Sequence, residues 1–270
     1  MAPTQKDAAA KFRALHAKGR ILVLPNAWDV ASARIAEDAG AEAIATSSAA
    51  VAWAHGYADG EKLPKARLLQ LVSDIVRLAK IPVTADSEAG YASDVAEVAG
   101  FVVSMAKAGA VGINIEDGTL PPSVLVDKIK AIKQACAREG FDVFINARTD
   151  VYLKSLVPAE KAMEETLARG KLYAAAGADG LFVPGLADAS GFRKVADAID
   201  LPINALVWPK LPDVATLKEA GVRRVSAGAS PARAAYGAMC RAAADLLKGS
   251  YEVMNAEAEG CPNLNALMSV

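Results

Sequence analysis

The amino-acid sequence predicts an α/β fold, a closed (β/α)8 barrel of TIM type with an extra helical segment at the carboxyl end. One observation is a transition that recurs along the chain: a helix ends, a glycine follows and an apolar strand begins. Glycine just past a helix end is a common stop signal because it adopts positive φ without strain. The transition occurs at residues 38–41, 107–110, 175–178 and 219–222.

A second observation is the number of strands. Eight short apolar segments are separated by stretches with helical periodicity, such as Leu125, Ile129 and Ile132. Strands that alternate with helices form parallel sheets, and eight such units in about 250 residues favour a closed barrel. An open doubly wound sheet is the alternative, but residues 25–29 after the first strand are not the glycine-rich loop it would want. The expected strands are residues 21–25, 43–47, 82–86, 111–116, 143–148, 180–184, 202–207 and 224–228.

Two segments lie outside the eight units. Residues 1–20 are expected to form a lid helix, because Phe12 and Leu15 share one helical face beside His16; a transit peptide is the alternative. After the last strand, residues 234–247 predict a long helix, and residues 251–270 carry scattered apolar side chains. We therefore expect a barrel domain over residues 1–236 and a helical tail over 237–270. The tail would cap the barrel or pack on a neighbouring subunit.

Composition excludes several classes of partner. The chain is 53% hydrophobic, with mean hydropathy +0.21 and net charge −1. No basic stripe indicates a nucleic-acid partner, and no apolar run reaches the roughly 18 residues needed to span a membrane. Its three cysteines, Cys136, Cys240 and Cys261, have no framework spacing, which favours the reducing cytoplasm. Cys136 continues the apolar stripe of its helix and is expected to be a small core residue.

Charged side chains end three neighbouring strands of the expected barrel. Alternation within a strand puts Thr84, Asp86 and, if the strand persists, Glu88 on one face, and Glu116 and Arg148 end the next two strands. Carboxylates held together need a cation between them, and hard oxygen ligands suit Mg2+ or Mn2+. A purely structural salt-bridge cluster is the alternative.

Further polar and aromatic residues follow the strands, at the end of a barrel where active sites lie. Asp29 and Asp150 are expected to cap helices, and His55 to be a hydrogen-bonded surface histidine. The other candidates for a site at this end are Ser47, Ser48, Asp59 and Asn204, and Trp28 is expected either to line the pocket or to pack at an interface.

From about Phe12 to Tyr236, the sequence resembles the isocitrate lyase/phosphoenolpyruvate mutase superfamily. Six motifs carry the resemblance: Pro-Asn-Ala-Trp-Asp at residues 25–29, Thr-Ser-Ser-Ala at 46–49, Gly-Tyr-Ala-Asp at 56–59, Asp-Ser-Glu-Ala-Gly-Tyr at 86–91, Ile-Glu-Asp at 115–117 and Asn-Ala-Arg-Thr at 146–149. Singly each motif is weak, but together they are specific.

The resemblance implies a Mg2+ site with Asp86 as the direct ligand. Glu88 and Glu116 would act mostly through water, and the metal would chelate the carboxylate and oxo group of a 2-oxo acid. Arg148 would hold a second anionic group. Ser47, Ser48 and the Ala49 backbone would bond the oxyanion, and Asp59 would orient a proton donor or water. The resemblance also implies a tetramer, or a dimer with exchanged carboxyl-terminal helices.

One departure from the superfamily narrows the expected activity. Members that split isocitrate or methylisocitrate carry Lys-Lys-Cys-Gly-His after the fourth strand, whereas residues 117–122 here read Asp-Gly-Thr-Leu-Pro-Pro. The mutase members place Lys and Asn there, and this loop lacks both. We therefore expect a Mg2+-dependent lyase acting on a small 2-oxo or 2-hydroxy dicarboxylate through an enolate, by decarboxylation of the oxaloacetate type or by another C–C cleavage. The alternatives are a P–C bond hydrolase or mutase acting on phosphonopyruvate or phosphoenolpyruvate, and a 2-oxo acid binding protein without turnover.

Overall fold

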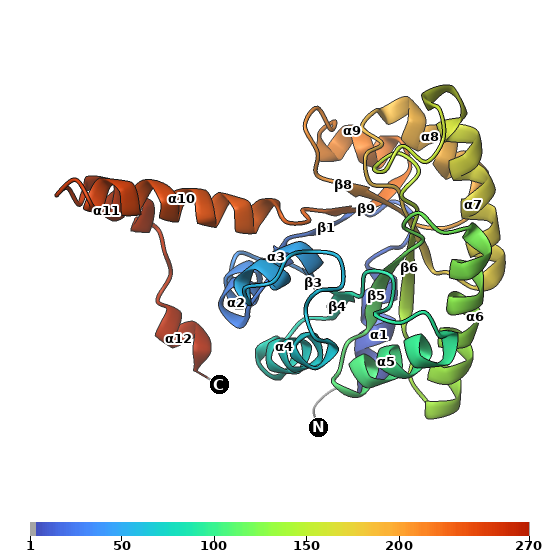
Figure 1. Ribbon diagram of the computed structural model, residues 1–270, viewed down its shortest axis with the longest axis horizontal. Coiled ribbons are helices and arrows are strands. Elements are labelled where there is room, and N and C mark those ends of the chain that lie inside the picture. Colours follow the sequence, from blue (N-terminus) through green and yellow to red (C-terminus); the bar gives the residue numbers. More distant parts are fainter. Residues whose placement is uncertain (1–3, 270) are drawn as a thin grey trace.

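The computed structural model describes residues 4–269 and shows a barrel of parallel strands surrounded by helices (Figure 1). Its nine strand segments follow the order β1-β9-β8-β7-β6-β5-β4-β3-β2. The first two segments, Leu22–Leu24 and Asn26–Ala27, flank Pro25, which has no N–H to donate to a ladder. They therefore form one interrupted strand, so the closed barrel has eight strands.

All eight expected strands are confirmed. The strands are β1 Leu22–Leu24, β2 Asn26–Ala27, β3 Ile44–Thr46, β4 Val83–Asp86, β5 Gly112–Glu116, β6 Phe144–Arg148, β7 Gly180–Phe182, β8 Ile203–Leu206 and β9 Val222–Ser226. The predicted stop signals are confirmed too. Gly40, Gly109, Gly177 and Gly221 have φ of 94°, 100°, 103° and 93°, values that glycine adopts without strain.

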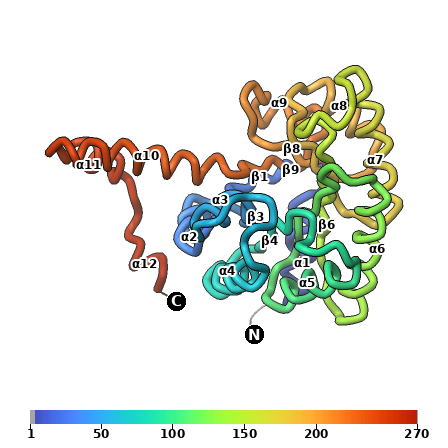
Figure 2. The backbone as a smooth tube through the Cα atoms, viewed as in Figure 1, coloured from blue at the N-terminus to red at the C-terminus, as the bar shows by residue number. Residues whose placement is uncertain are grey.

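Helices cover the outer surface of the barrel, as the coloured tube of Figure 2 shows. The largest apolar cluster lies between the strands and these helices, and Cys136 belongs to it, as expected. The helices are α1 Gln5–Ala14, α2 Val30–Asp38, α3 Ser48–Ala54, α4 Lys65–Leu78, α5 Val95–Lys107, α6 Pro122–Glu139, α7 Ala162–Ala176, α8 Ala189–Ala198, α9 Val214–Glu219, α10 Ser230–Leu246, α11 Glu252–Ala258 and α12 Leu264–Met268, with a 3-10 turn η1 at Ala159–Lys161.

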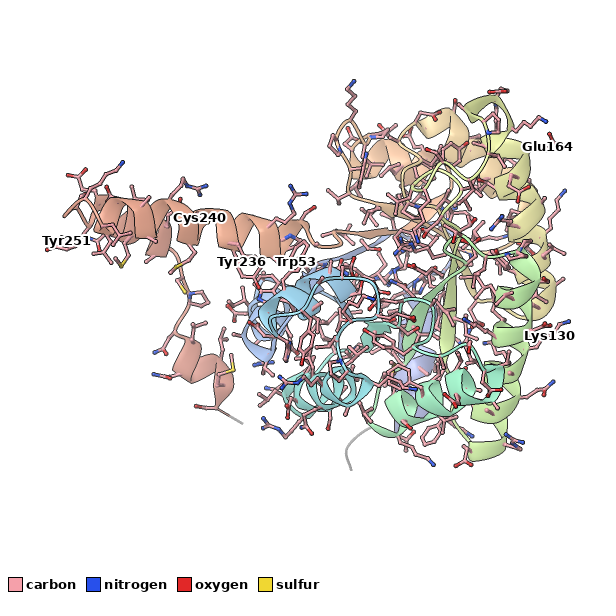
Figure 3. The ribbon with its side chains drawn as sticks, viewed as in Figure 1. Trp53, Lys130, Glu164, Tyr236, Cys240 and Tyr251 are labelled. Atoms are coloured by element: carbon pink, nitrogen blue, oxygen red, sulfur yellow. The ribbon has the colours of Figure 1, made fainter. Side chains whose placement is uncertain are left out.

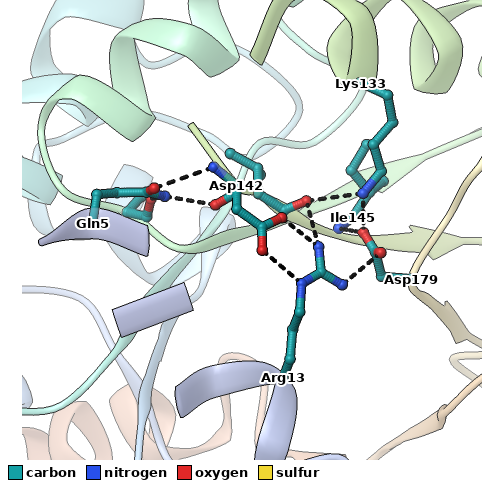
Figure 4. A network of polar contacts seen from close by, with 8 residues as sticks. Gln5, Arg13, Lys133, Asp142, Ile145 and Asp179 are labelled. Carbon is teal, nitrogen blue, oxygen red and sulfur yellow. Dashed lines mark hydrogen bonds and ion pairs between the residues drawn. The ribbon is translucent and has the colours of Figure 1, made fainter. Parts of the chain in front are cut away.

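Helix α1 closes the amino-terminal end of the barrel. Phe12 packs edge-on against Phe144, the first residue of β6, with ring centroids 5.4 Å apart. The guanidinium of Arg13 donates to both carboxylate oxygens of Asp142, at 2.9 and 2.6 Å, and to Asp179 at 2.7 Å (Figure 4). The expected helix is confirmed, and it closes the end of the barrel where the strands begin. The apolar face of α1 plugs the end opposite to the one where the strands carry their acids.

The carboxyl-terminal helices leave the barrel instead of covering it. Helix α10 projects away from the strands, and Tyr236, Cys240 and Tyr251 lie along this extension (Figure 3). Helix α12 folds back beside α2, where the Nε of Arg34 donates to the carbonyl of Leu267 at 3.0 Å. Because α10 points away, the outward-facing Val23 of β1 stays 49% exposed. The expected boundary at residue 236 falls inside α10, which runs unbroken from Ser230 to Leu246.

No helix in the described part of the chain is both long enough and apolar enough to cross a membrane.

We predict that His16 makes the free energy of unfolding depend on pH. The ring is 5% exposed, and burial lowers the pKa of His16 from 6.5 to about 3. Between these values the unfolded chain binds a proton that the folded chain does not, so stability conferred by neutral His16 is complete above about pH 6.5 and is lost as pH falls towards 3. Urea titrations from pH 7 to pH 4 should therefore show a shallower loss of stability in His16→Gln than in the wild type.

His55→Gln is the matched control for this titration. The ring nitrogen of His55 also contacts the carbonyl four residues earlier, at 2.9 Å, but His55 is only half-buried. Its replacement should change the slope less. Equal slopes in the wild type and His16→Gln would contradict the prediction.

Candidate active site

A cavity of about 180 Å3 opens at the carboxyl ends of the strands. It collects six of the expected site residues: Ser47, Ser48, Ala49, Asp59, Asp86 and Arg148. Its remaining lining residues are Asn26, Asn114, Leu153, Phe182, Leu206, Ser226, Gly228 and Ala229. Side chains from at least six different strands or the loops after them therefore meet in one small space.

Asp86 lies at the end of β4 and its carboxylate has few partners. One oxygen accepts from the backbone N–H of Glu88 at 3.2 Å, and the other accepts from the N–H of Ser48 at 3.4 Å. The N–H of Asp86 itself donates to Thr46 Oγ1 at 2.8 Å, which fixes the end of the strand. Burial raises the pKa of Asp86, and the positive charge of Arg148 opposes this rise. The carboxylate is thus an acceptor with spare capacity beside a cavity.

Arg148 is held between two carboxylates. Its Nη1 lies 2.7 Å from Glu116 Oε2, and its Nε donates to Asp150 Oδ1 at 2.6 Å. The strand register puts Glu116 and Arg148 side by side, so β5 and β6 deliver this pair directly. Nη2 makes no hydrogen bond to a described residue, and this leaves one edge of the guanidinium for a ligand. Asp150 is therefore an ion-pair partner, and the expectation that it caps a helix was wrong.

Glu116 is a second acid with an unusual environment. Burial raises the pKa of Glu116 to about 7, and Arg148 partly opposes this rise. Lys154 Nζ lies 3.4 Å from its other oxygen. Glu116 does not line the cavity, but it borders the cavity through Arg148.

Glu88 does not continue the strand face. The strand ends at Asp86, and Glu88 adopts a left-handed backbone conformation with φ of 48°. Its carboxylate accepts from the Tyr91 hydroxyl and from the Glu61 N–H, both at 2.6 Å. This turn directs Glu88 out of the cavity lining and into contacts with the loop that contains Asp59.

The structure also places Trp28 and Asn204 outside the cavity lining. Trp28 packs near Tyr236 of α10, with ring centroids 6.3 Å apart. Asn204 is 1% exposed inside the barrel, where its Oδ1 accepts from the Ser226 hydroxyl at 2.8 Å. Asn204 is two residues short of Leu206, the residue of β8 that does reach the cavity, so it lies deeper along the strand.

Asn114 is a lining residue that the sequence analysis did not assign. Its strand alternates inward and outward, so it shares the inner face with Glu116, two residues later. In the ladder Asn114 is the partner of Asp86. That alternation places Asn114 on the face of Glu116 from the sequence alone, but it does not assign a role to the amide.

Asp117 and Asp29 have structural roles. Asp117 is 3% exposed and accepts from Arg169 Nη1 at 2.8 Å and from the Tyr173 hydroxyl at 2.6 Å. These bonds tie the end of β5 to α7. Asp29 accepts from the Ser32 N–H at 2.6 Å and caps α2, as predicted.

The donor set around Asp86 fits a hard cation bound largely through water. In residues 4–269 no three His, Cys, Asp or Glu side chains converge closely enough to hold a metal ion directly. Asp86 and Asp59 are the acidic residues that line the cavity, and Asp86 lies at a strand end, while the carboxylates of Glu88 and Glu116 are engaged by neighbouring side chains. A metal with one protein ligand and several waters is typical of Mg2+, which dehydrates reluctantly.

The chain is similar in sequence to a known family and to two proteins that match most of its length. The family model described as phosphoenolpyruvate phosphomutase matches residues 12–247. An uncharacterized protein of Mycobacterium tuberculosis is 36% identical over 242 residues, which cover 88% of this chain and 89% of that protein. The oxaloacetate decarboxylase of a Marinomonas species is 30% identical over 252 residues, covering 91% of this chain and 86% of the enzyme.

Solved structures agree with the fold. 2,3-Dimethylmalate lyase, a PEP mutase/isocitrate lyase superfamily member, superposes with a TM-score of 0.80 at 28% identity, covering 89% of this chain and 88% of that one. Phosphonopyruvate hydrolase in complex with oxalate and Mg2+ superposes with a TM-score of 0.82 at 22% identity, covering 98% and 95%. At 22% identity, the similarity to the hydrolase supports the barrel fold and nothing finer.

We predict unequal stability effects for the two adjacent acids at the end of β5. Asp117→Asn removes the carboxylate that faces buried Arg169 and should lower the free energy of unfolding by about 3 kcal/mol, the usual effect of breaking a buried pair. Glu116→Gln removes a charge that burial already disfavours and should stay within about 1 kcal/mol of wild type. Urea unfolding measures both, and an equal loss in both variants would contradict the separation of roles.

Proposed function

Because the chain belongs to the phosphoenolpyruvate mutase/isocitrate lyase superfamily, whose members act as lyases and mutases on small carboxylates, we propose that it is a Mg2+-dependent carbon–carbon lyase. Its substrate is a small 2-oxo or 2-hydroxy dicarboxylate, and the reaction passes through an enolate as in the decarboxylation of oxaloacetate. The observation that carries the proposal is the joint placement of Asp86 and Arg148 in one cavity of about 180 Å3. Such a volume suits a molecule of a few carbon atoms.

Each binding group of the chain has a defined part in this reaction. Arg148 uses its free edge to hold a carboxylate of the substrate, while Glu116 and Asp150 hold the guanidinium in place. Helix α3 begins at Ser48, and Ser47, Ser48 and Ala49 line the cavity, so the serine hydroxyls and the Ala49 N–H would stabilise negative charge on the bound ligand. Asp86 would hold Mg2+ directly, with Glu88 and Glu116 contacting its waters. The metal would supply Lewis-acid stabilisation of charge on the oxo group.

The decarboxylation needs no reactant other than the substrate and water. The bond between C3 and the distal carboxylate breaks, CO2 leaves, and the electron pair moves into the enolate. A proton from water then adds to the carbon. Water is the proton source because the cavity lining holds no cysteine, histidine or lysine among the described residues. The loop over residues 117–122 has none of the three either.

The loop composition also selects among superfamily reactions. Cleavage of isocitrate-type substrates in the cysteine-bearing members needs a general acid at this loop, whereas decarboxylation leaves an enolate that water can protonate. The 30% identity to an oxaloacetate decarboxylase over most of both chains supports the same choice. The family model, described as a phosphomutase, favours P–C chemistry as the second candidate.

One assay separates these candidates. Purified protein with Mg2+ is given oxaloacetate or phosphonopyruvate, and pyruvate and phosphate are measured before and after EDTA. EDTA-sensitive pyruvate from oxaloacetate, above the rate with Mg2+ alone, supports the lyase. Phosphate release from phosphonopyruvate would support the second candidate, and tight binding of either acid without turnover would indicate a binding protein.

We predict that Asp86→Asn abolishes the Mg2+-dependent part of ligand binding. Calorimetry with oxalate, a mimic of the enolate, should show Mg2+-stimulated binding in the wild type and none in this variant, because an amide cannot replace an anionic ligand of Mg2+. Asp94→Asn is the matched control, since Asp94 caps α5 and asparagine caps as well as aspartate. Unchanged Mg2+-dependent affinity in Asp86→Asn would refute the metal assignment.

We further propose that the tail mediates assembly into a tetramer, or a dimer with exchanged carboxyl-terminal helices. Met239, Leu247 and Tyr251 are 66%, 88% and 63% exposed, and Val23 of β1 is 49% exposed. Apolar surface of this kind on one side of a chain marks an interface.

Charged substitutions test this assembly. Met239→Glu with Leu247→Glu should lower the mass measured by light scattering towards that of one chain while circular dichroism stays unchanged. Leu172→Glu on α7, where the side chain is 47% exposed, is the control and should leave the mass unaltered. A wild-type protein with the mass of one chain would exclude the proposal.

A further inference from the structure

Arg224 is a buried arginine without a carboxylate partner. It lies on β9 inside the barrel and is 1% exposed. Among the described residues no Asp or Glu lies within ion-pair distance of it, and its Nε and Nη1 have no hydrogen-bond partner. Its one hydrogen bond runs from Nη2 to Asn114 Oδ1 at 3.2 Å. Burial lowers the pKa of Arg224 to about 9, which reflects the cost of holding this charge.

Stability does not explain such a residue. A buried charge lacking a partner is among the least favourable groups in a protein interior, and an apolar side chain of similar size is usually neutral or stabilising in its place. The neighbouring strand offers no compensation, because Nδ2 of Asn204, the ladder partner of Arg224, is also without a partner among the described residues. Local rules are broken in this way most often at functional sites.

The single bond of Arg224 fixes the orientation of an amide. A guanidinium only donates, so the Asn114 atom that it faces must be the oxygen. The same oxygen accepts from Asn146 Nδ2 at 2.9 Å. Two donors on one oxygen, from strands on either side of the interior, exclude the flipped orientation of the Asn114 amide.

The amide nitrogen of Asn114 is therefore directed away from this pair of donors. It donates to no described residue, and it is not among the buried atoms that lack a partner. Asn114 lines the cavity and is the ladder partner of Asp86. Together these observations leave the Asn114 NH2 group as a free donor at the cavity floor, beside the acid.

We infer that Asn114 donates a hydrogen bond to an oxygen of the bound carboxylate or oxo group, and that Arg224 is the positioning residue that holds the Asn114 amide in the donating orientation. The chemical class of the ligand rests on the proposed function. The orientation itself rests on the contacts of Arg224 and Asn146 alone. Arg224 thus acts on the ligand through Asn114, one layer of side chains below it.

The main experiment compares stability with ligand affinity in Arg224→Met. Removing the unpaired charge should keep or raise the urea midpoint, and the released amide should weaken Mg2+-dependent oxalate binding about tenfold, the effect of one hydrogen bond. In Asn114→Ala, oxalate should bind similarly weakly, and Arg224→Met added to it should cause no further loss. Independent, additive losses would overturn the positioning role.

Two more variants keep the test decisive. Thr166→Val is the matched control, because Thr166 Oγ1 on α7 is likewise buried without a partner but lies outside the cavity lining; its oxalate affinity should equal that of the wild type. Asn114→Asp serves if Arg224→Met does not fold. It gives Arg224 a carboxylate and so should retain the wild-type midpoint, yet it presents an oxygen where a donor stood and should weaken oxalate binding at least tenfold. Wild-type affinity in Asn114→Asp would overturn the inference.

The outcomes separate this inference from the proposed function. Suppose that the wild-type protein binds oxalate, that Arg224→Met binds it about tenfold more weakly, and that the wild type turns over neither oxaloacetate nor phosphonopyruvate. This outcome would support the inference and contradict the proposed function. Turnover of oxaloacetate that Arg224→Met leaves unchanged would keep the function and remove the inference. A wild-type protein that does not bind oxalate with Mg2+ would overturn the inference, because the donor would then face no carboxylate site.

Discussion

Closure of the barrel is the constraint on which the site depends. Every second side chain of each strand points into a narrow interior, where a polar group without a hydrogen-bond partner is costly, so pairing between strands decides which polar residues are satisfied. Along β5 and β6 the register pairs Asn114 with Asn146 and Glu116 with Arg148. The same two strands therefore carry an amide pair in one layer and an ion pair in the next, and the cavity opens above them.

Position along the strand decides what each polar residue can do. Glu116 and Asp117 are consecutive, yet the first faces the arginine at the cavity and the second faces α7 through Arg169 and Tyr173. The carboxylate with the most hydrogen bonds is the structural one. Asp86, which has two long bonds to backbone N–H groups, is the acid with capacity left for a ligand.

Much of the fold could be predicted because its signals are local. A glycine at a helix end and a short apolar run are each visible within a few residues, and eight of them in alternation specify the barrel. The same alternation of strands and helices predicted four cavity residues, because the carboxyl ends of parallel strands converge in a barrel. These residues are Asp86, Arg148, Ser47 and Ser48. Glu88 was expected on the face of Asp86 only if the strand persisted, and the left-handed backbone of Glu88 shows that the strand ends before it.

The features that escaped prediction depend on contacts between distant strands. The orientation of Asn114 depends on Arg224, 110 residues away along the chain. The position of α1 at the amino-terminal end depends on Arg13 reaching Asp142 and Asp179. An amphipathic helix looks the same in sequence at either end of a barrel, and only such ion pairs distinguish the two.

The pairing of β1 with β9 has a consequence for how the chain matures. Leu22 pairs with Arg224 across the seam of the barrel, and α10 turns away from that seam instead of covering it. During synthesis the first strand leaves the ribosome long before its partner and waits with one edge open, a state prone to pairing with other chains. The plug of α1 against β6 can form earlier than the seam, since Phe144 emerges well before Arg224. Packing of the amino-terminal helix would then hold the early strands in register until β9 is synthesised and pairs with β1, which closes the barrel.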